Sequence, residues 1–252
     1  MSMLSRIVGW LDGELDAASF ADSSNNGLQV ENSGKATRVC CGVDATMEFF
    51  EAAAARGGDL LVCHHGMSWG ASLARIHGMD RKRLSFLLER DIALYASHLP
   101  LDGHPRYGNN AAMARLLGLK SVKPFGVHGG RAIGLAGLLP AAMDRAAFTR
   151  LVARKMRPDP TVLGFGPERI RSVAVVSGGA AGDVADAGKL GLDAFVSGEI
   201  ALSGYNFAKE YGVNAVFAGH YATERFGVCE LGKAVSRKFR VPWEFIDLEI
   251  PW

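Results

Sequence analysis

Chemically versatile side chains stand where four apolar, strand-like runs of the sequence end. They are His64 and His65 after DLLVC, His98 and Asp102 after IALYA, Glu199 after DAFVS, and His220 and Glu224 after AVFA. In an open α/β sheet, ligands bind beyond the carboxyl ends of the strands. Imidazoles mixed with carboxylates suit zinc, iron, manganese, cobalt or nickel. The spacing therefore predicts a metal centre at such an edge.

Five of these residues form the predicted ligand set: His64, His65, Asp102, His220 and Glu224. Two metal ions about 3.5–4 Å apart need a set of about this size, often with a bridging carboxylate. Glu224 is the expected bridge, because a helix N-cap at Thr223 would place it in the first helical turn, where the helix dipole favours a carboxylate. A His-His pair alone is more often structural, so the prediction depends on the whole set.

Two further residues are candidates for catalytic proton transfer. His98 is a ligand, a base beside the ligands or a structural histidine, and Glu199 is an acid–base group or a support for a ligand. Surface loops are expected to hold the remaining histidines, His77, His104 and His128. The segment SGGAAG at 177–182 lacks the Lys-Ser/Thr pair of a P-loop, so a tight turn is favoured over a phosphate cradle.

The elements that position these residues alternate between apolar strands and segments of helical period, which indicates an α/β fold. Strands are predicted at 38–43, 59–63, 92–96, 131–139, 172–176, 193–197, 215–218 and 243–248. Helices are predicted at the N-terminus, at 47–56, 81–90, 110–117, 183–190, 202–211 and 223–237, and after Asp144. Asp44 and Asp144 are the predicted caps of the helices that follow them. No Pro- or Ser-rich linker divides the chain, so two interlocked halves are expected.

The chain also shows signs of an internal duplication. Residues 39–63 align with 173–197 without a gap, and YASHLPLD at 95–102 aligns with FAGHYATE at 217–224. The second alignment superposes His98 on His220 and Asp102 on Glu224. General similarity between β-α-β units explains the apolar matches, but it explains a shared His-x-x-x-acid pattern less well. Approximate repeat halves are therefore predicted at 1–125 and 126–252.

Composition excludes several classes of protein. The chain has 252 residues, of which 48% are hydrophobic and 21% charged, and its net charge is +2. It is too apolar for intrinsic disorder and too weakly charged to favour a nucleic-acid partner. No apolar run approaches the about 18–20 residues of a membrane span, and the N-terminus predicts an amphipathic helix rather than a signal peptide. The four cysteines include no Cys-x-x-Cys pair, so a cytoplasmic protein is expected.

Eight motifs run in order along nearly the whole chain. They are NGLQV at 26–30, GVDAT at 42–46, DLLVCHHGMSWG at 59–70, ASHLPLD at 96–102, GNNAAMARLLGL at 108–119, SGGA at 177–180, DAFVSGE at 193–199 and GHYATERFGV at 219–228. Together they resemble the dinuclear metal-centre hexameric proteins, the Ngg-interacting-factor-three-like family, whose members are often named GTP cyclohydrolase 1 type 2. One departure is RAIG from Arg131, where the family tends to have a shorter Arg-Ile-Gly.

The resemblance implies a single family unit over 1–252, with two intertwined, internally duplicated α/β lobes of three layers, α/β/α, and no inserted middle domain. It implies a toroidal homohexamer and two divalent metal ions, and it carries the family's ligands onto the same five residues. It also implies a hydrolase in which a metal-activated hydroxide opens the imidazole ring of a purine, with GTP as the small-molecule substrate, and releases formate. Two alternatives stay open: another metal-dependent phosphoesterase or nuclease, and a non-catalytic metal-binding scaffold that acts through protein partners.

Overall fold

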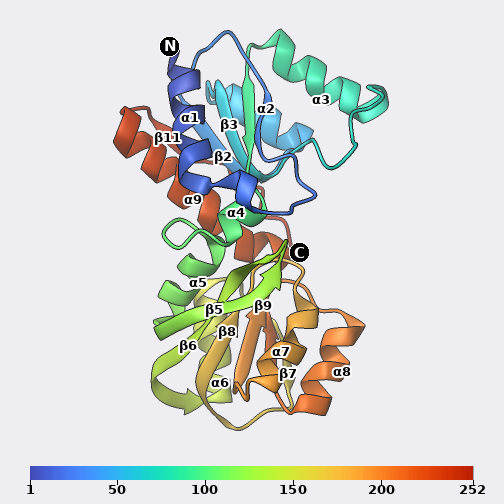
Figure 1. Cartoon of the computed structure of the whole chain (residues 1–252), viewed down its shortest axis with the longest axis vertical. Helices are drawn as coiled ribbons and strands as arrows, with labels where there is room; N and C mark the ends of the chain where they lie inside the picture. The colour runs from blue at the N-terminus through green and yellow to red at the C-terminus, as the bar shows by residue number, and fades with distance from the viewer. Residues whose placement is uncertain (252) are drawn as a thin grey trace. The chain divides into compact units, whose positions relative to one another are not determined.

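The fold seen in the computed structural model is mixed α/β, as predicted, and residues 1–251 are described (Figure 1). The chain forms two compact units. Unit 1 comprises Met1–Leu101 and Gly227–Glu249, and unit 2 comprises Asp102–Phe226 with the chain from residue 250. The chain thus leaves unit 1 for unit 2 and later returns. These compact units do not test the predicted repeat halves, because the halves were inferred from internal sequence similarity. The repeat halves therefore stay a prediction.

Unit 1 contains a five-stranded sheet made of β1 (Gly27–Val30), β2 (Val39–Asp44), β3 (Leu60–His65), β4 (Ala93–Ala96) and β11 (Trp243–Phe245). The strand order is β1-β4-β3-β2-β11. β1 pairs antiparallel with β4, and all the other neighbours are parallel. Every residue of β3 except His65 is buried. A continuous buried run is typical of a parallel sheet that is covered on both faces.

Helices cover this sheet. They are α1 (Met3–Leu15), α2 (Met47–Ala55), α3 (Gly78–Glu89) and the later part of α9 (His220–Phe239), with the start of the short α4 (Leu99–Asp102) after β4. Phe49 of α2 and Leu87 of α3 pack with Cys40 of β2 in one core cluster. Strand alternation turns Cys41 to the opposite face. There α9 approaches closely, since a Cβ at Gly232 would lie 2.8 Å from Cys41 Sγ.

Unit 2 contains a six-stranded sheet made of β5 (Lys120–His128), β6 (Arg131–Asp144), β7 (Thr161–Gly164), β8 (Arg169–Val175), β9 (Ala194–Ser197) and β10 (Asn214–Phe217). The strand order is β5-β6-β8-β9-β10-β7, and β8, β9 and β10 run parallel. The sequence patterns did not predict β5 and β7, nor β1 of unit 1. The first five residues of β5 are exposed, so no apolar run marks this strand.

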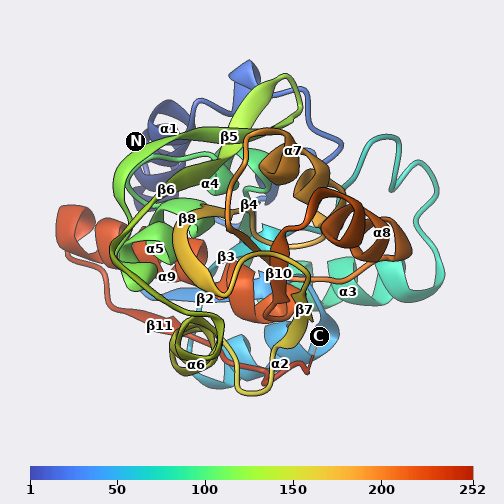
Figure 2. The same ribbon diagram turned by 90° about the horizontal axis from the view of Figure 1, so that it is seen from below.

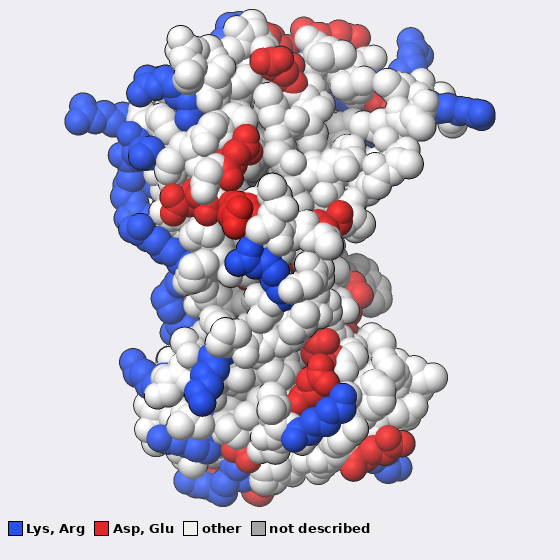
Figure 3. All heavy atoms as spheres, in the orientation of Figure 1, with Lys and Arg blue, Asp and Glu red and all other residues white. Residues whose placement is uncertain are grey.

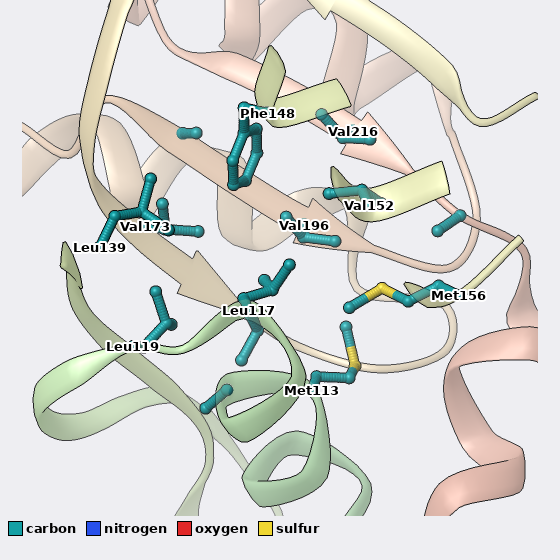
Figure 4. Close-up of a cluster of buried hydrophobic side chains, with 14 of the residues drawn as sticks. Met113, Leu117, Leu119, Leu139, Phe148, Val152, Met156, Val173, Val196 and Val216 are labelled. Carbon is teal, nitrogen blue, oxygen red and sulfur yellow. The ribbon is translucent and has the colours of Figure 1, made fainter. Parts of the chain in front are cut away.

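The helices of unit 2 are α5 (Asn109–Leu117), α6 (Arg145–Lys155), α7 (Val184–Lys189), α8 (Leu202–Tyr211) and the first residues of α9. Figure 4 shows the core that α5 and α6 form with the sheet, in which Phe148 and Val152 of α6 lie near Val196 of β9. α7 and α8 lie side by side and contact β9 and β10 respectively (Figure 2). Phe148 and Val152 of α6 and Met156 just after it are buried in this core, and Leu151 packs against it partly buried.

Two predicted helix caps differ in the structure. Thr46, not Asp44, is the N-cap of α2, and its Oγ1 accepts a hydrogen bond from the Phe49 N–H at 3.2 Å. Asp44 is the last residue of β2 instead. Asp144 occupies the N-cap position of α6, but its side chain makes no capping hydrogen bond. Its carboxylate accepts a hydrogen bond from Arg169 at 2.9 Å, which competes with the capping geometry.

The surface carries charges of both signs. Lys and Arg are interspersed with Asp and Glu on the face shown in Figure 3, as the net charge of +2 suggests. Within residues 1–251, no helix combines the length and the apolar character that crossing a membrane requires.

Candidate functional site

Unit 1 brings three histidines together where two of its strands end. His64 and His65 end β3, and His98 follows β4 after a single residue. One nitrogen of each ring lies within 4.8 Å of a nitrogen of the other two. The ring centres of His64 and His98 are 5.1 Å apart. This histidine cluster (His64, His65, His98) arises because β3 and β4 are parallel neighbours whose carboxyl ends meet at one edge.

The neighbours His64 and His65 can share this cluster although strand alternation should separate them. Their ring centres are only 4.7 Å apart. His65 is the last residue of β3 and pairs in register with Asp44. The His65 Nδ1 lies 2.8 Å from Asp44 Oδ1, and this bond turns the ring along the edge of the sheet.

Every ring of the histidine cluster is held through Nδ1. His64 Nδ1 bonds to the backbone oxygen of Ser97 at 2.8 Å, and His98 Nδ1 to Asp22 Oδ1 at 2.9 Å. In a neutral imidazole the nitrogen that donates carries the proton, so this bonding pattern assigns Nε2 as the atom that each ring offers. An oxygen behind the ring is what fixes metal-ligating histidines in proteins.

Asp22 is a residue of this site that the sequence analysis missed. Its side chain is 2% exposed and accepts hydrogen bonds from the His98 ring, the Asn26 amide and the backbone N–H groups of Ser24 and Leu99. Burial would raise the pKa of Asp22, but the hydrogen bonds from His98, Asn26 and Ser24 outweigh it and hold the pKa well below its usual value. The polar run DSSNN predicts a structured turn, but not the histidine that the turn supports.

Unit 2 brings together the other three predicted ligands. His220 is the first residue of α9, and Glu224 lies four residues later on the same face. His220 Nε2 is 3.0 Å from Glu224 Oε2. A carboxylate oxygen of Asp102 lies within 4.8 Å of one of Glu224. We call Asp102, His220 and Glu224 the carboxylate cluster.

The helix start corrects one prediction about this cluster. Thr223 is inside α9 rather than at its N-cap, since the helix begins at His220. Its Oγ1 donates back toward the His220 carbonyl at 2.9 Å and accepts from the Gly178 N–H at 3.0 Å. Glu224 therefore lies beyond the first turn, where the helix dipole no longer favours its ionised form. Its position one turn after His220 instead brings its carboxylate beside the His220 ring.

Asp102 and the turn at 177–178 support each other. Asp102 is 3% exposed, and its Oδ1 accepts from Asn109 Nδ2 and Ser177 Oγ, each at 2.8 Å. Gly178 has a φ of +68°, and a Cβ there would lie 3.1 Å from His220 Nε2 and collide with Glu224 Oε1. The Gly178 N–H is already bonded to Thr223, and the choice between a tight turn and a phosphate cradle at 177–182 stays a prediction.

His220 supplies the positive charge that balances the carboxylates of the carboxylate cluster. Burial lowers the pKa of His220, but the hydrogen bond and charge of Glu224, followed by those of Glu199, raise the pKa to about 9. Glu199 Oε1 lies 2.8 Å from His220 Nδ1. Glu199 thus supports the ring of a predicted ligand, as Asp44 supports His65.

Two of the three remaining histidines make hydrogen bonds within unit 2. His128 Nε2 lies 2.8 Å from Asp183, and His104 Nδ1 accepts from the backbone N–H of Tyr107 at 2.9 Å. His77 precedes α3 as its N-cap residue. His128 ends β5 rather than lying in a surface loop as predicted, and the His77 side chain makes no capping hydrogen bond.

Both clusters offer donor atoms of the kind that hold a divalent metal ion: the three ring nitrogens of the histidine cluster lie within 4.8 Å of one another, and Glu224 lies close to both Asp102 and His220. The histidine cluster offers ring nitrogens fixed from behind, and the carboxylate cluster offers two carboxylates and one ring nitrogen. Sets of this kind suit zinc and its neighbours in the first transition row. Because residue 178 is a glycine, no side chain projects from it toward His220 and Glu224.

Comparison with known proteins gives consistent results. The family model described as Duf34/NIF3 (NGG1p interacting factor 3) matches residues 2–250. A protein from Archaeoglobus fulgidus is 41% identical over 245 residues, which cover 97% of this chain and 98% of that protein. One from Deinococcus radiodurans is 40% identical over 241 residues, or 96% and 91% of the two chains. Both relatives are named GTP cyclohydrolase 1 type 2 homolog.

Solved structures agree over the whole length. A structure described as protein ybgI, of unknown function, is 32% identical with a TM-score of 0.93, covering 100% of both chains. A protein from Thermus thermophilus is 35% identical with a TM-score of 0.89, covering 98% of this chain and 99% of that one. Because the family model spans nearly every residue and these relatives match end to end, the chain belongs to the Duf34/NIF3 family.

Proposed function

We propose that this protein is a hydrolase that uses two divalent metal ions, held by His64, His65, Asp102, His220 and Glu224. The observation that carries the proposal is the common orientation of its histidines. His64, His65 and His220 are each held at Nδ1 by an oxygen 2.8 Å away, which makes Nε2 the candidate ligand atom of each, and Nε2 of His220 lies 3.0 Å from Glu224, another predicted ligand. A hydrogen bond from the other ring nitrogen to a carboxylate or a backbone oxygen is what metal-ligating histidines almost always make.

The reaction we propose is the opening of the purine imidazole ring of GTP with release of formate. The names of the relatives from Archaeoglobus fulgidus and Deinococcus radiodurans support this choice. When bound, two divalent ions supply an activated water and polarise the group that it attacks. A mixed nitrogen and carboxylate donor set is the kind that serves this chemistry.

We assign proton transfer in this reaction to two residues of the chain, His98 and Glu199. His98 is held at Nδ1 by Asp22, so its Nε2 accepts a proton while Asp22 stabilises the charged ring. Glu199 holds His220 through Oε1. Its side chain is 53% exposed, so it can exchange a proton with solvent while it orients the ring.

Formate release tests the proposal. The protein is reconstituted separately with zinc, iron, manganese, cobalt and nickel and incubated with GTP, and formate and phosphate are both measured. We expect formate with at least one metal, and a kcat about 10²–10⁴ lower in His98→Gln at unchanged metal content. Release of phosphate without formate would show that the protein hydrolyses the phosphate groups of GTP and does not open the purine ring. Full metal occupancy without either product would overturn the enzyme assignment and favour a scaffold.

A further inference from the structure

A cavity of about 280 Å³ lies in unit 2 at the carboxyl ends of two parallel strands. Gly198, Glu199 and Ile200 follow β9, and Phe217 and Gly219 lie at the end of β10. This edge is where open α/β sheets bind their ligands. The volume is near the lower end of small-molecule sites, which span about 300–1,000 Å³. The cavity therefore suits a small ligand or one part of a larger one.

Arg157 gives this cavity a positive charge. It follows the end of α6, and it lines the cavity together with Thr161 of β7. Across residues 1–251, neither a hydrogen bond nor an ion pair joins the Arg157 side chain to another residue. The carboxylate on the wall is that of Glu199, and the ring of His220 already engages it at 2.8 Å. A partly buried arginine whose guanidinium is not paired with a carboxylate attracts an oxyanion.

The rest of the wall is apolar and sets the shape of the ligand. Phe217 is 3% exposed, so its ring is part of the packed wall, while Ile200 is 46% exposed. Thr161 pairs in register with Phe217 and adds a hydroxyl beside the ring. A ligand with an oxyanion at one end and an apolar or aromatic body fits this combination.

We propose that this cavity binds a small organic oxyanion, a phosphate monoester or a carboxylate, with Arg157 as the residue that holds the anionic group. The apolar body then lies against Phe217 and Ile200. Glu199 belongs both to the cavity wall and to the hydrogen bond that fixes His220, so a ligand held here adjoins the carboxylate cluster. That this ligand is the substrate of the reaction rests on the proposed function, whereas the binding itself does not.

Calorimetric titration of the metal-free protein tests the binding, because removing metal with a chelator excludes direct contact between the anion and a metal ion. The probes are phenyl phosphate, benzoate and inorganic phosphate. We expect saturable binding of phenyl phosphate or benzoate, and the tighter of the two identifies the oxyanion. Arg157→Gln should weaken this binding at least about tenfold, since a hydrogen bond to a charged group is lost. Arg157→Lys keeps the charge and should lose less.

The matched control is Arg150→Gln. Arg150 is exposed on α6 and does not line the cavity, so its removal changes the net charge equally. We expect less than about twofold weakening for this variant. Equal weakening in the two variants, or no saturable binding by the wild type, would overturn the inference. The two proposals can fail separately. Absence of formate release would not contradict anion binding by the cavity, and absence of Arg157-dependent binding would not contradict the proposed metal ligands.

Discussion

The histidine cluster of unit 1 and the carboxylate cluster of unit 2 differ in charge and in their supports. The first offers three imidazoles, two held by carboxylates, Asp44 and Asp22, and one by a backbone oxygen. The second offers two carboxylates within 4.8 Å of each other and one imidazole, whose pKa is about 9. Close carboxylates repel each other unless a positive charge lies between them. A proton on His220 supplies that charge when metal is absent.

The difference assigns a separate role to each cluster. In the proposed metal centre, neutral ring nitrogens would add no charge to a bound cation, so His64 and His65 would determine which metals are preferred rather than how strongly charge attracts them. The carboxylate cluster would supply the attraction, and metal binding there would displace the His220 proton. Substitutions in the two clusters should therefore have different signatures.

The largest effect is expected from Gly178→Ala in unit 2. The left-handed φ and the collision with Glu224 should lower the free energy of unfolding by about 2–4 kcal/mol and displace the carboxylate. Gly179→Ala is the control, because a Cβ there would stand 3.6 Å from Glu199 Oε2, at ordinary contact distance. Urea titration of both variants checks the difference. Equal stability of the two would contradict the packing described around Glu224.

A smaller effect is expected from Asp22→Ala in unit 1. The change leaves the backbone N–H groups of Ser24 and Leu99 and the His98 ring without their acceptor, at a cost of about 2–3 kcal/mol in the free energy of unfolding. Glu51→Ala, on an exposed position of α2, should change stability by less than about 0.5 kcal/mol. Chemical denaturation distinguishes them, and a loss no larger than that of the control would contradict the role of Asp22.

Asp22 also predicts a dependence on acid. Its pKa in the folded chain lies below the usual 3.8, so its contribution to stability is present above about pH 4 and is lost as the pH falls further. The stability difference between wild type and Asp22→Asn should shrink below that pH. A difference that stays constant down to about pH 2 would show that the carboxylate is not stabilised by folding.

The smallest effect is a pH dependence from His220 in metal-free protein. Its pKa rises from 6.5 to about 9 on folding, so its stabilising effect is complete below pH 6.5 and is lost as the pH rises through 9. Because the ring is partly exposed, we expect a decline of about 1–2 kcal/mol over this range. His220→Gln should remove the decline. Denaturation in chelator at several pH values from about 6 to 10 measures it, and an unchanged slope in the variant would reject the assignment.

Much of the fold could be predicted because local patterns were strong. Helix α8 has the bounds that periodicity predicts, 202–211, and Gly118 ends α5 in the left-handed conformation expected of a C-cap. β5 was missed because its exposed start has no apolar run. The predicted start of α9 was wrong because threonine is a common N-cap residue. Thr223 lies inside the helix, and its hydroxyl accepts a hydrogen bond from the Gly178 N–H.

The site was predicted by residue type and only in part by its supports. Strand ends identified the histidines, because a carboxyl edge of a parallel sheet collects them. Asp22 was missed because its bond to His98 joins residues 76 positions apart, and no local pattern encodes such a pairing. The bond between Asp44 and His65 was missed as well, because an aspartate before a helix suggests an N-cap.

Metal content per chain, measured by plasma mass spectrometry on untagged protein purified without chelator, tests the central claim most directly. The wild type should contain about two metal ions per chain. Glu224→Ala and His64→Ala, one from each cluster, should both lose metal, whereas Glu210→Ala on the exposed face of α8 should retain it. Little metal in the wild type after attempted reconstitution, or full content in Glu224→Ala, would contradict a metal centre built from these residues.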